Sequence, residues 1–144
     1  MFTLNGAYIH ERQNRAASFA AGTAEHPTGT LNSTSLNASY YYDAHYGLSA
    51  GRFLNHGSRD QVLFAAEPGS GSRTGSPDSS GTIIQADWTP FGGKDSWHAP
   101  WANARLGLQY TIYDKFNGAA HDYDDFGRSA HDNNTLFLFL WLAI

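Results

Sequence analysis

An acidic segment that begins at His121 has the residue types best suited to holding a metal ion. It reads His121-Asp122-Tyr123-Asp124-Asp125, and carboxylate oxygens are ligands that Ca²⁺ accepts. The segment lacks the twelve-residue spacing and the terminal Glu of an EF-hand loop. Short acidic runs are usually solvated, so we interpret it as a hydrated surface loop. Calcium binding by Asp122, Asp124 and Asp125 is the weaker alternative, and we expect no resident cofactor.

The seven histidines do not suggest a second metal site. They are spread along the chain without an i,i+2 or i,i+4 pair, the spacings that place two imidazoles on one side of a strand or helix. We expect most of them to be exposed.

Three polar side chains, by contrast, are predicted to meet. Gln85 and Asp87 alternate with apolar residues in one segment, and Arg105 does so in the next, so antiparallel pairing would place them on one face. An ion pair there would either line a lumen and influence which ions enter, or be a structural contact that fills the interior. The sequence leaves both readings open.

Composition and motifs argue against several classes of function. The chain has neither a phosphate-binding P-loop nor a dinucleotide fingerprint. It has no cysteine, which excludes disulfides, thiol catalysis and covalent attachment of haem. Its nine Lys and Arg residues are scattered and the formal net charge is −4, which argues against nucleic-acid binding. We therefore predict a protein that is not an enzyme.

The C-terminal segment gives the clearest indication of architecture. From Leu136 to Ile144, leucines alternate with Phe137, Phe139 and Trp141, which favours a strand over a helix. A tilted strand crosses a membrane with about 9–11 residues, whereas a helix needs about 20. In water, the edge of such a strand would expose unpaired N–H and C=O groups that favour aggregation. In a closed barrel within lipid both of its edges would be paired.

Five further segments alternate in the same way. The predicted strands lie near 2–10, 33–43, 46–54, 81–89, 102–113 and 133–144. Long loops are predicted at 11–31, 55–80 and 114–132, with shorter turns at 43–45 and 89–100. The second long loop has a flexible core, PGSGSRTGSPDSSG. Long loops on one side and short turns on the other are typical of outer-membrane barrels, whose short turns face the periplasm. An aromatic girdle is predicted at the turn side: Phe2, Tyr42, Tyr46, Trp88 and Trp101.

The alternation assigns side chains to two environments. The following are predicted to face lipid: Leu36, Ala38, Tyr40, Leu48, Ile84, Ala86, Leu106, Leu108, Tyr110, Leu138, Leu140 and Leu142. The following are predicted to line the lumen: Asn37, Ser39, Gln85, Asp87, Arg105 and Gln109. Phe137, Phe139 and Trp141 would share the lumen side, which indicates an interior that is partly packed, plugged or set against another subunit.

The predicted fold class is all-β: an antiparallel up-and-down transmembrane β-barrel or a six-strand fragment of one. A mean hydropathy of −0.45 together with 15% aromatic residues fits a polar lumen flanked by aromatic girdles. Six strands are fewer than the eight of the smallest single-chain bacterial barrels, and the N-terminal segment has no signal-peptide pattern. We therefore expect an internal fragment of a longer chain. The alternative is a soluble β-sandwich that binds through its long loops.

Three stretches carry a resemblance to a known family: SYYYDAHYGLSAGRF, SGTIIQADWTPFGG and the segment from Ala104 to the C-terminus. They resemble the last six strands of large Gram-negative outer-membrane barrels, in which a Tyr-rich hairpin and a final NNTL-type strand recur. The resemblance implies a passive, porin-like channel in the bacterial outer membrane, or a sheath for an electron-transfer partner such as a cytochrome. It also implies contact with outer-membrane lipid, insertion by the barrel-assembly machinery, and completion by the remaining strands of a larger barrel or by an oligomer.

Overall fold

The computed structural model describes residues 1–93, 96 and 102–143. Each alternating segment forms a strand, since side chains at successive positions of a strand point to opposite faces. The strands are β1 (Phe2–Asn14), β2 (Thr28–Tyr42), β3 (Tyr46–Gly57), β4 (Ser79–Trp88), β5 (Asn103–Lys115) and β6 (Thr135–Ala143). A short helix α1 (Ala16–Ala20) and a 3₁₀ turn η1 (Ala130–Asn133) lie in the loops. None of the helices in these ranges is long and apolar enough to cross a membrane.

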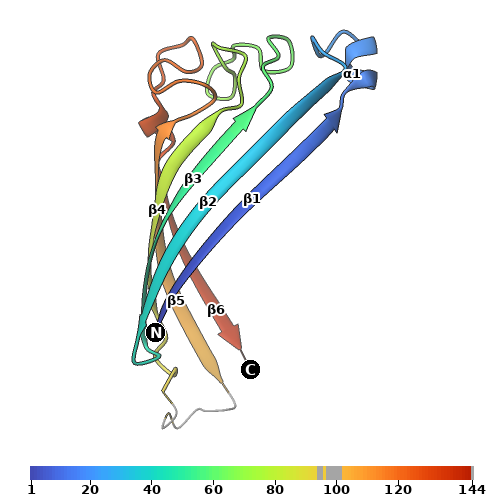
Figure 1. Ribbon diagram of the computed structural model, residues 1–144. Helices are drawn as coiled ribbons and strands as arrows, with labels where there is room; N and C mark the ends of the chain where they lie inside the picture. The colour runs from blue at the N-terminus through green and yellow to red at the C-terminus, as the bar shows by residue number, and fades with distance from the viewer. Residues whose placement is uncertain (94–95, 97–101, 144) are drawn as a thin grey trace.

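The six strands form one sheet in chain order, each antiparallel to the next (Figure 1). The predicted all-β, antiparallel, up-and-down topology is confirmed. Closure into a barrel is not observed, because β1 and β6 are the two edges of an open sheet. The described residues also contain no second sheet of the kind a β-sandwich requires.

The strands extend further toward the long loops than predicted. Residues 11–14 and 28–31 belong to β1 and β2, residues 55–57 and 79–80 to β3 and β4, and residues 114–115 to β5. Polar residues dominate these extensions, so hydrophobic alternation did not detect them, although ladder hydrogen bonds continue through them. Conversely, β6 begins only at Thr135. The predicted positions Trp101 and Ile144 lie outside the described residues.

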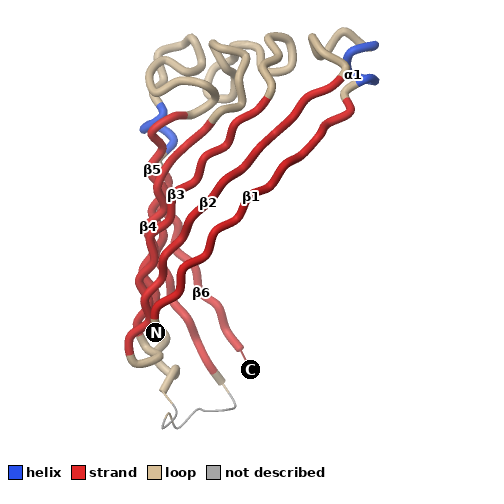
Figure 2. The backbone as a smooth tube through the Cα atoms, viewed as in Figure 1, coloured by secondary structure: helices blue, strands red, loops and turns tan. Residues whose placement is uncertain are grey.

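The three long loops gather at one end of the sheet, and both chain ends lie toward the other (Figure 2). At that second end, β2 and β3 are joined by a tight turn in which Asp43 and Ala44 both have positive φ, 47° and 53°. Positive φ at both central residues is the turn type whose twist matches an antiparallel hairpin. We refer to the two ends as the loop end and the turn end.

Residues directly opposite each other in adjacent strands share a face. One register row reads Tyr40, Leu48, Ala86, Leu108 and Leu138, and the adjacent row reads Ser39, Ser49, Gln85, Gln109 and Phe137. We call the face of the first row the apolar face and that of the second the polar face. All twelve residues predicted to contact lipid lie on the apolar face, and all six predicted to line a lumen lie on the polar face.

The apolar face carries an Arg–Asp ion pair that the sequence analysis did not foresee. Arg52 pairs with Asp114 and also donates to Thr82 Oγ1 at 3.1 Å. Asp114 lies where the register between β4 and β5 shifts, next to the Ser80/Gly81 step. The pair therefore occupies the loop-end margin of the apolar face.

Candidate functional site

The polar face contains a compact cluster of charged and amide groups near the turn end. Arg105 donates two hydrogen bonds to Asp87, from Nε to Oδ1 at 3.1 Å and from Nη2 to Oδ2 at 2.8 Å. Gln85 Nε2 donates to both Asp87 oxygens at 3.0 and 3.1 Å. The predicted meeting of these three side chains is therefore present in the structure.

The cluster is electrically balanced, and its carboxylate is enclosed while the Arg105 side chain is 36% exposed. The side chain of Asp87 is only 2% exposed, and a two-pronged guanidinium–carboxylate pair has the geometry that gives strong, oriented hydrogen bonds. The Arg105 guanidinium also lies 5.8 Å from the ring centre of Phe139, within the range of a cation–π contact. Such a cluster holds β4, β5 and β6 in register and presents little net charge.

Large rings on the polar face lie across glycines of the neighbouring strand. Three directly opposed pairs show this arrangement: Tyr41 with Gly47, Phe53 with Gly81, and Phe139 with Gly107. A Cβ added to Gly107 would lie 2.1 Å from Phe139 Cζ, and one added to Gly47 would lie 2.8 Å from Tyr41 Cε1. Glycine is therefore required at these positions because the ring occupies the space of a side chain.

This packing predicts that Gly107→Ala destabilises the sheet by about 1–3 kcal/mol, because the Phe139 ring must leave its position. Gly6→Ala is the matched control, since an added Cβ there meets nothing closer than 3.8 Å. Unfolding by denaturant in detergent micelles measures both. If Gly6→Ala and Gly107→Ala lowered the free energy of unfolding equally, the Phe139 ring would not be the reason that glycine is required at position 107.

Ser49 lies in the pattern Gly47-Leu48-Ser49-Ala50-Gly51, the spacing of a nucleophile elbow. That motif requires a sharp turn between a strand and a helix. Ser49 instead lies within β3, directly opposite Ser39 and Gln85. The pattern here reflects small residues on the polar face.

At the loop end, Asp60 connects the first long loop to the second. Its carboxylate accepts N–H groups of Glu25 at 2.9 Å, Leu63 at 2.9 Å, Val62 at 3.2 Å and His26 at 3.4 Å, and it pairs with Arg15 Nη1 at 3.5 Å. Asp60 is fully buried and Arg15 is nearly so. Arg15 also lies 5.7 Å from the ring centre of Phe64. Residues 58–78 are therefore tied to residues 15–27 by contacts that their composition did not predict.

Asp124 has the same role between the second and third long loops. It accepts N–H groups of Gly69 at 2.9 Å, Phe126 at 3.0 Å and Arg128 at 3.1 Å. The adjacent Tyr123 is fully buried, and its hydroxyl donates to the Gly69 carbonyl at 2.9 Å. We call the three connected loops, residues 15–27, 58–78 and 116–134, the loop platform.

These contacts define the surroundings of the three Asp residues named as the calcium alternative. Asp124 is occupied by backbone donors, and Asp122 accepts the N–H of Gly127 and pairs with Arg73 at 3.4 Å. Within the described ranges, no group of three or more His, Asp or Glu side chains could hold a metal ion. Asp124 is thus a structural group of the platform, whereas His121 and Asp125 of the same segment are exposed.

Burial alone would raise the pKa of both platform carboxyls. The N–H donors of Leu63, Glu25, His26 and Val62 outweigh burial at Asp60 and hold its pKa below the usual value. Gly69, Phe126 and Arg128 do the same for the pKa of Asp124. Both groups therefore stabilise the platform in their ionised form.

This gives a pH prediction with a definite sign. A carboxyl with a lowered folded pKa contributes stability that is complete above its unfolded pKa, about 3.9, and is lost as the pH falls through the folded pKa. We expect exchange protection of the Gly69 and Phe126 amides, corrected for intrinsic rates, to be constant from pH 8 to 5 and to fall below about pH 4. Loss of amide protection between pH 8 and 5 would show that the platform is not stabilised by carboxylates with lowered pKa values.

A line of aromatic rings joins the polar face to the platform. Successive ring centres lie 5.6 Å apart from Phe53 to Tyr113, 5.2 Å from Tyr113 to Phe116 and 4.9 Å from Phe116 to Tyr123. All three contacts are edge-on, the arrangement that aromatic pairs prefer. The platform is therefore packed onto the loop end of the sheet as well as hydrogen-bonded within itself.

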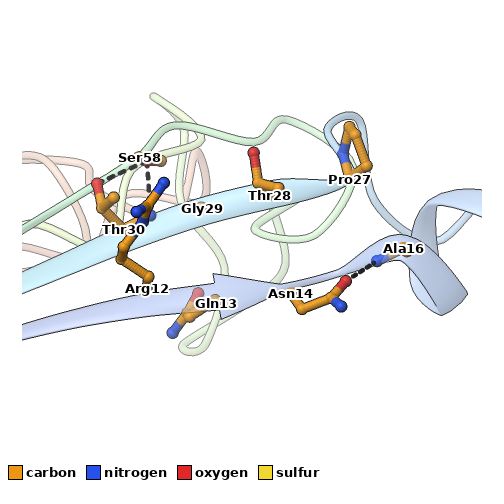
Figure 3. A pocket seen from close by; sticks show the side chains of 9 residues that line it. All are labelled: Arg12, Gln13, Asn14, Ala16, Pro27, Thr28, Gly29, Thr30 and Ser58. Carbon is orange, nitrogen blue, oxygen red and sulfur yellow. Dashed lines mark hydrogen bonds between the residues drawn. The ribbon is translucent and has the colours of Figure 1, made fainter.

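Among the surface hollows of the described ranges, two have volumes of about 430 Å³ each. One lies where β1 and β2 meet the platform, between Arg12, Thr28 and Ser58 (Figure 3). There Thr30 donates its N–H to Ser58 Oγ at 2.9 Å. The other lies on the apolar face near the turn end and is lined by Tyr46, Trp88 and Leu108 among others. Neither contains a cluster of catalytic groups.

No family model, curated protein or solved structure matches the chain. Function must therefore be inferred from the geometry of the two faces and the platform.

The apolar face is exposed over its whole width. The ten largest side chains predicted to contact lipid are between 39% and 66% exposed, from Leu106 to Leu138. The girdle residues Phe2, Tyr42, Tyr46 and Trp88 lie together at the turn end of this face. On the polar face, by contrast, Ser39, Asp87 and Thr111 are buried.

Proposed function

We propose that this chain forms part of the wall of a transmembrane β-barrel in a bacterial outer membrane and contributes to a passive, porin-like channel. The observation that carries the proposal is the exposed apolar face, which crosses all six strands without any described residue covering it. A soluble protein rarely exposes a contiguous apolar patch of this kind. Hydrocarbon satisfies such a face, while the polar networks of the opposite face suit a lumen.

The arrangement of the ends supports the same proposal. Three ordered loops at one end and a tight turn at the other match the asymmetry of outer-membrane barrels, in which the turns face the periplasm. The Tyr and Trp side chains at the turn end of the apolar face suit the membrane–water interface. The soluble binding module remains the rival, and it requires a separate layer over the apolar face.

Refolding the full chain with phospholipid vesicles tests the proposal. We expect the protein to float with the vesicles, to resist extraction at high pH and to release a small trapped dye. A chain that stays monomeric in the aqueous phase without detergent would overturn the membrane assignment and favour the soluble module.

The balanced Asp87–Arg105 cluster leads to a prediction for ion preference. Asp87→Asn leaves Arg105 as an unpaired cation on the polar face, so the reversal potential in a salt gradient should shift toward anion selectivity. Gln85→Glu, at the same cluster, should shift it toward cations. Identical reversal potentials for the two variants would show that this face does not line the conducting path.

A further inference from the structure

The middle of the polar face carries no net charge. Within the described strands, the charged side chains of this face are Glu11, Asp87 and Arg105. Asp87 and Arg105 neutralise each other, and Glu11 lies near the loop end of β1. The remaining positions are mostly hydroxyls, amides, glycines and aromatic rings. Channels that select ions use rings of charged side chains or backbone carbonyls, so this face is better suited to an uncharged solute.

Two aromatic rings on this face lie flat against the sheet. A Cβ added to Gly107 would lie 2.1, 2.4 and 2.7 Å from Cζ, Cε1 and Cε2 of Phe139. Such similar distances to three neighbouring ring atoms place that Cβ beneath the ring and not beside its edge. Because a Cβ projects away from the sheet, the other face of the Phe139 ring points into the space that a barrel would enclose. The Phe137 ring is nearly parallel to it, at 25°, with its centre 5.9 Å away. We call these two rings the aromatic strip.

Uncharged hydrogen-bonding groups lie beside the aromatic strip. Gln109 is directly opposite Phe137, and Gln85 and Ser49 continue the same register row. The side chains of Gln109 and Ser49 are half-buried and have no hydrogen-bond partner among the described residues. A side-chain amide has two N–H donors and an acceptor oxygen. Gln109 therefore offers both kinds of group next to an aromatic ring.

This arrangement does not depend on what pairs with β6. An adjacent strand lies about 4.8 Å away in the plane of the sheet, so its backbone would lie beside Phe137 and not over the face of its ring. Gln109 lies on β5, which is paired on its two sides by β4 and β6. The aromatic strip and Gln109 therefore keep their places in a larger barrel.

We propose that the solute of the channel is a short neutral oligosaccharide, which packs on the aromatic strip and hydrogen-bonds to Gln109. The C–H groups on one side of a sugar ring carry partial positive charge and suit the negative face of an aromatic ring. The hydroxyl groups at the rim of the sugar both donate and accept hydrogen bonds, as a side-chain amide does. This inference rests on the proposed channel function and names the class of its solute.

The test records ion current through the full chain in a planar bilayer, with maltohexaose, a neutral linear glucose oligomer, as the probe. We expect the sugar to reduce the current in a saturable manner. Polyethylene glycol of the same mass, which has no ring faces, should give no saturable block. Phe137→Ala should weaken the apparent affinity for the sugar about tenfold, the order of loss seen when a stacked base loses its aromatic partner. Phe137→Tyr keeps a ring and should retain the affinity.

The matched control is Leu138→Ala, one residue away on the apolar face, which should leave both the current and the sugar affinity unchanged. Equal affinities for Phe137→Ala and Leu138→Ala would overturn the proposal, as would a conducting channel that maltohexaose does not block. A larger current in Phe137→Ala without sugar block in the original chain would show that the ring only fills the lumen. Absence of any conductance would refute the channel function itself, and the choice of solute would fall with it.

Discussion

Replacing Leu108 with Arg is expected to lower the free energy of unfolding in a bilayer by about 2–4 kcal/mol. Leu108 lies in the middle of the apolar face, directly opposite Ala86 and Leu138, and is 46% exposed. In a membrane that exposed surface meets hydrocarbon, so a guanidinium there loses its hydration. Denaturant unfolding of vesicle-inserted protein measures the loss.

The control is the next residue. Gln109 lies on the polar face, opposite Gln85 and Phe137. Gln109→Arg therefore places the new charge among polar groups and should lower the free energy of unfolding only slightly. Both variants carry the same new side chain at nearly the same depth. If Leu108→Arg and Gln109→Arg lowered the free energy of unfolding equally, the apolar and polar faces would not lie in different environments. That result would refute the barrel proposal.

Alternation of side chains was sufficient to predict the sheet. The run of leucines that includes Leu106 and Leu108 has a period of two, and a strand has the same period, so both the type of element and the face of each residue follow from one pattern. The meeting of Asp87 with Arg105 also follows, because a short connection between antiparallel strands brings their adjacent positions together.

Barrel closure was not predictable in the same way. Alternation specifies which face a residue occupies, but it carries no information on how far the sheet curves or on what pairs with its edges. The open edges of β1 and β6 are therefore a result of the structure. The ring of Phe139 over Gly107 was also missed, although a glycine opposite an aromatic residue was a usable signal.

The loop platform was the largest omission. Asp60 bonds to Glu25 across 35 residues, and Asp124 bonds to Gly69 across 55. Contacts at such separations leave no local periodicity in the sequence. The Gly- and Ser-rich composition of residues 58–78 was therefore interpreted as flexible, although Ser72 and Ser76 are buried. Small residues there also permit close packing of the loops.

The importance of Asp60 leads to the second large prediction. Asp60→Ala removes the partner of a nearly buried Arg15 and leaves four backbone N–H groups without their acceptor. Breaking a buried ion pair by removing one partner typically costs about 3–5 kcal/mol. We expect the free energy of opening of the platform to fall by that amount, with the sheet itself much less affected, because Asp60 contacts loop residues and not the paired rows of the strands.

Limited proteolysis under native conditions separates these outcomes, since cleavage of a folded protein reports the local opening equilibrium. Cleavage within residues 58–78 should accelerate in Asp60→Ala, whereas β3 and β4 should stay protected. Arg59→Ala, an exposed neighbour in the same loop, should change opening by less than about 0.5 kcal/mol. If the two variants were cleaved at the same rate, the platform would not depend on its buried carboxylate. The loops would then be held by the ring contacts from Phe116 to Tyr123 instead.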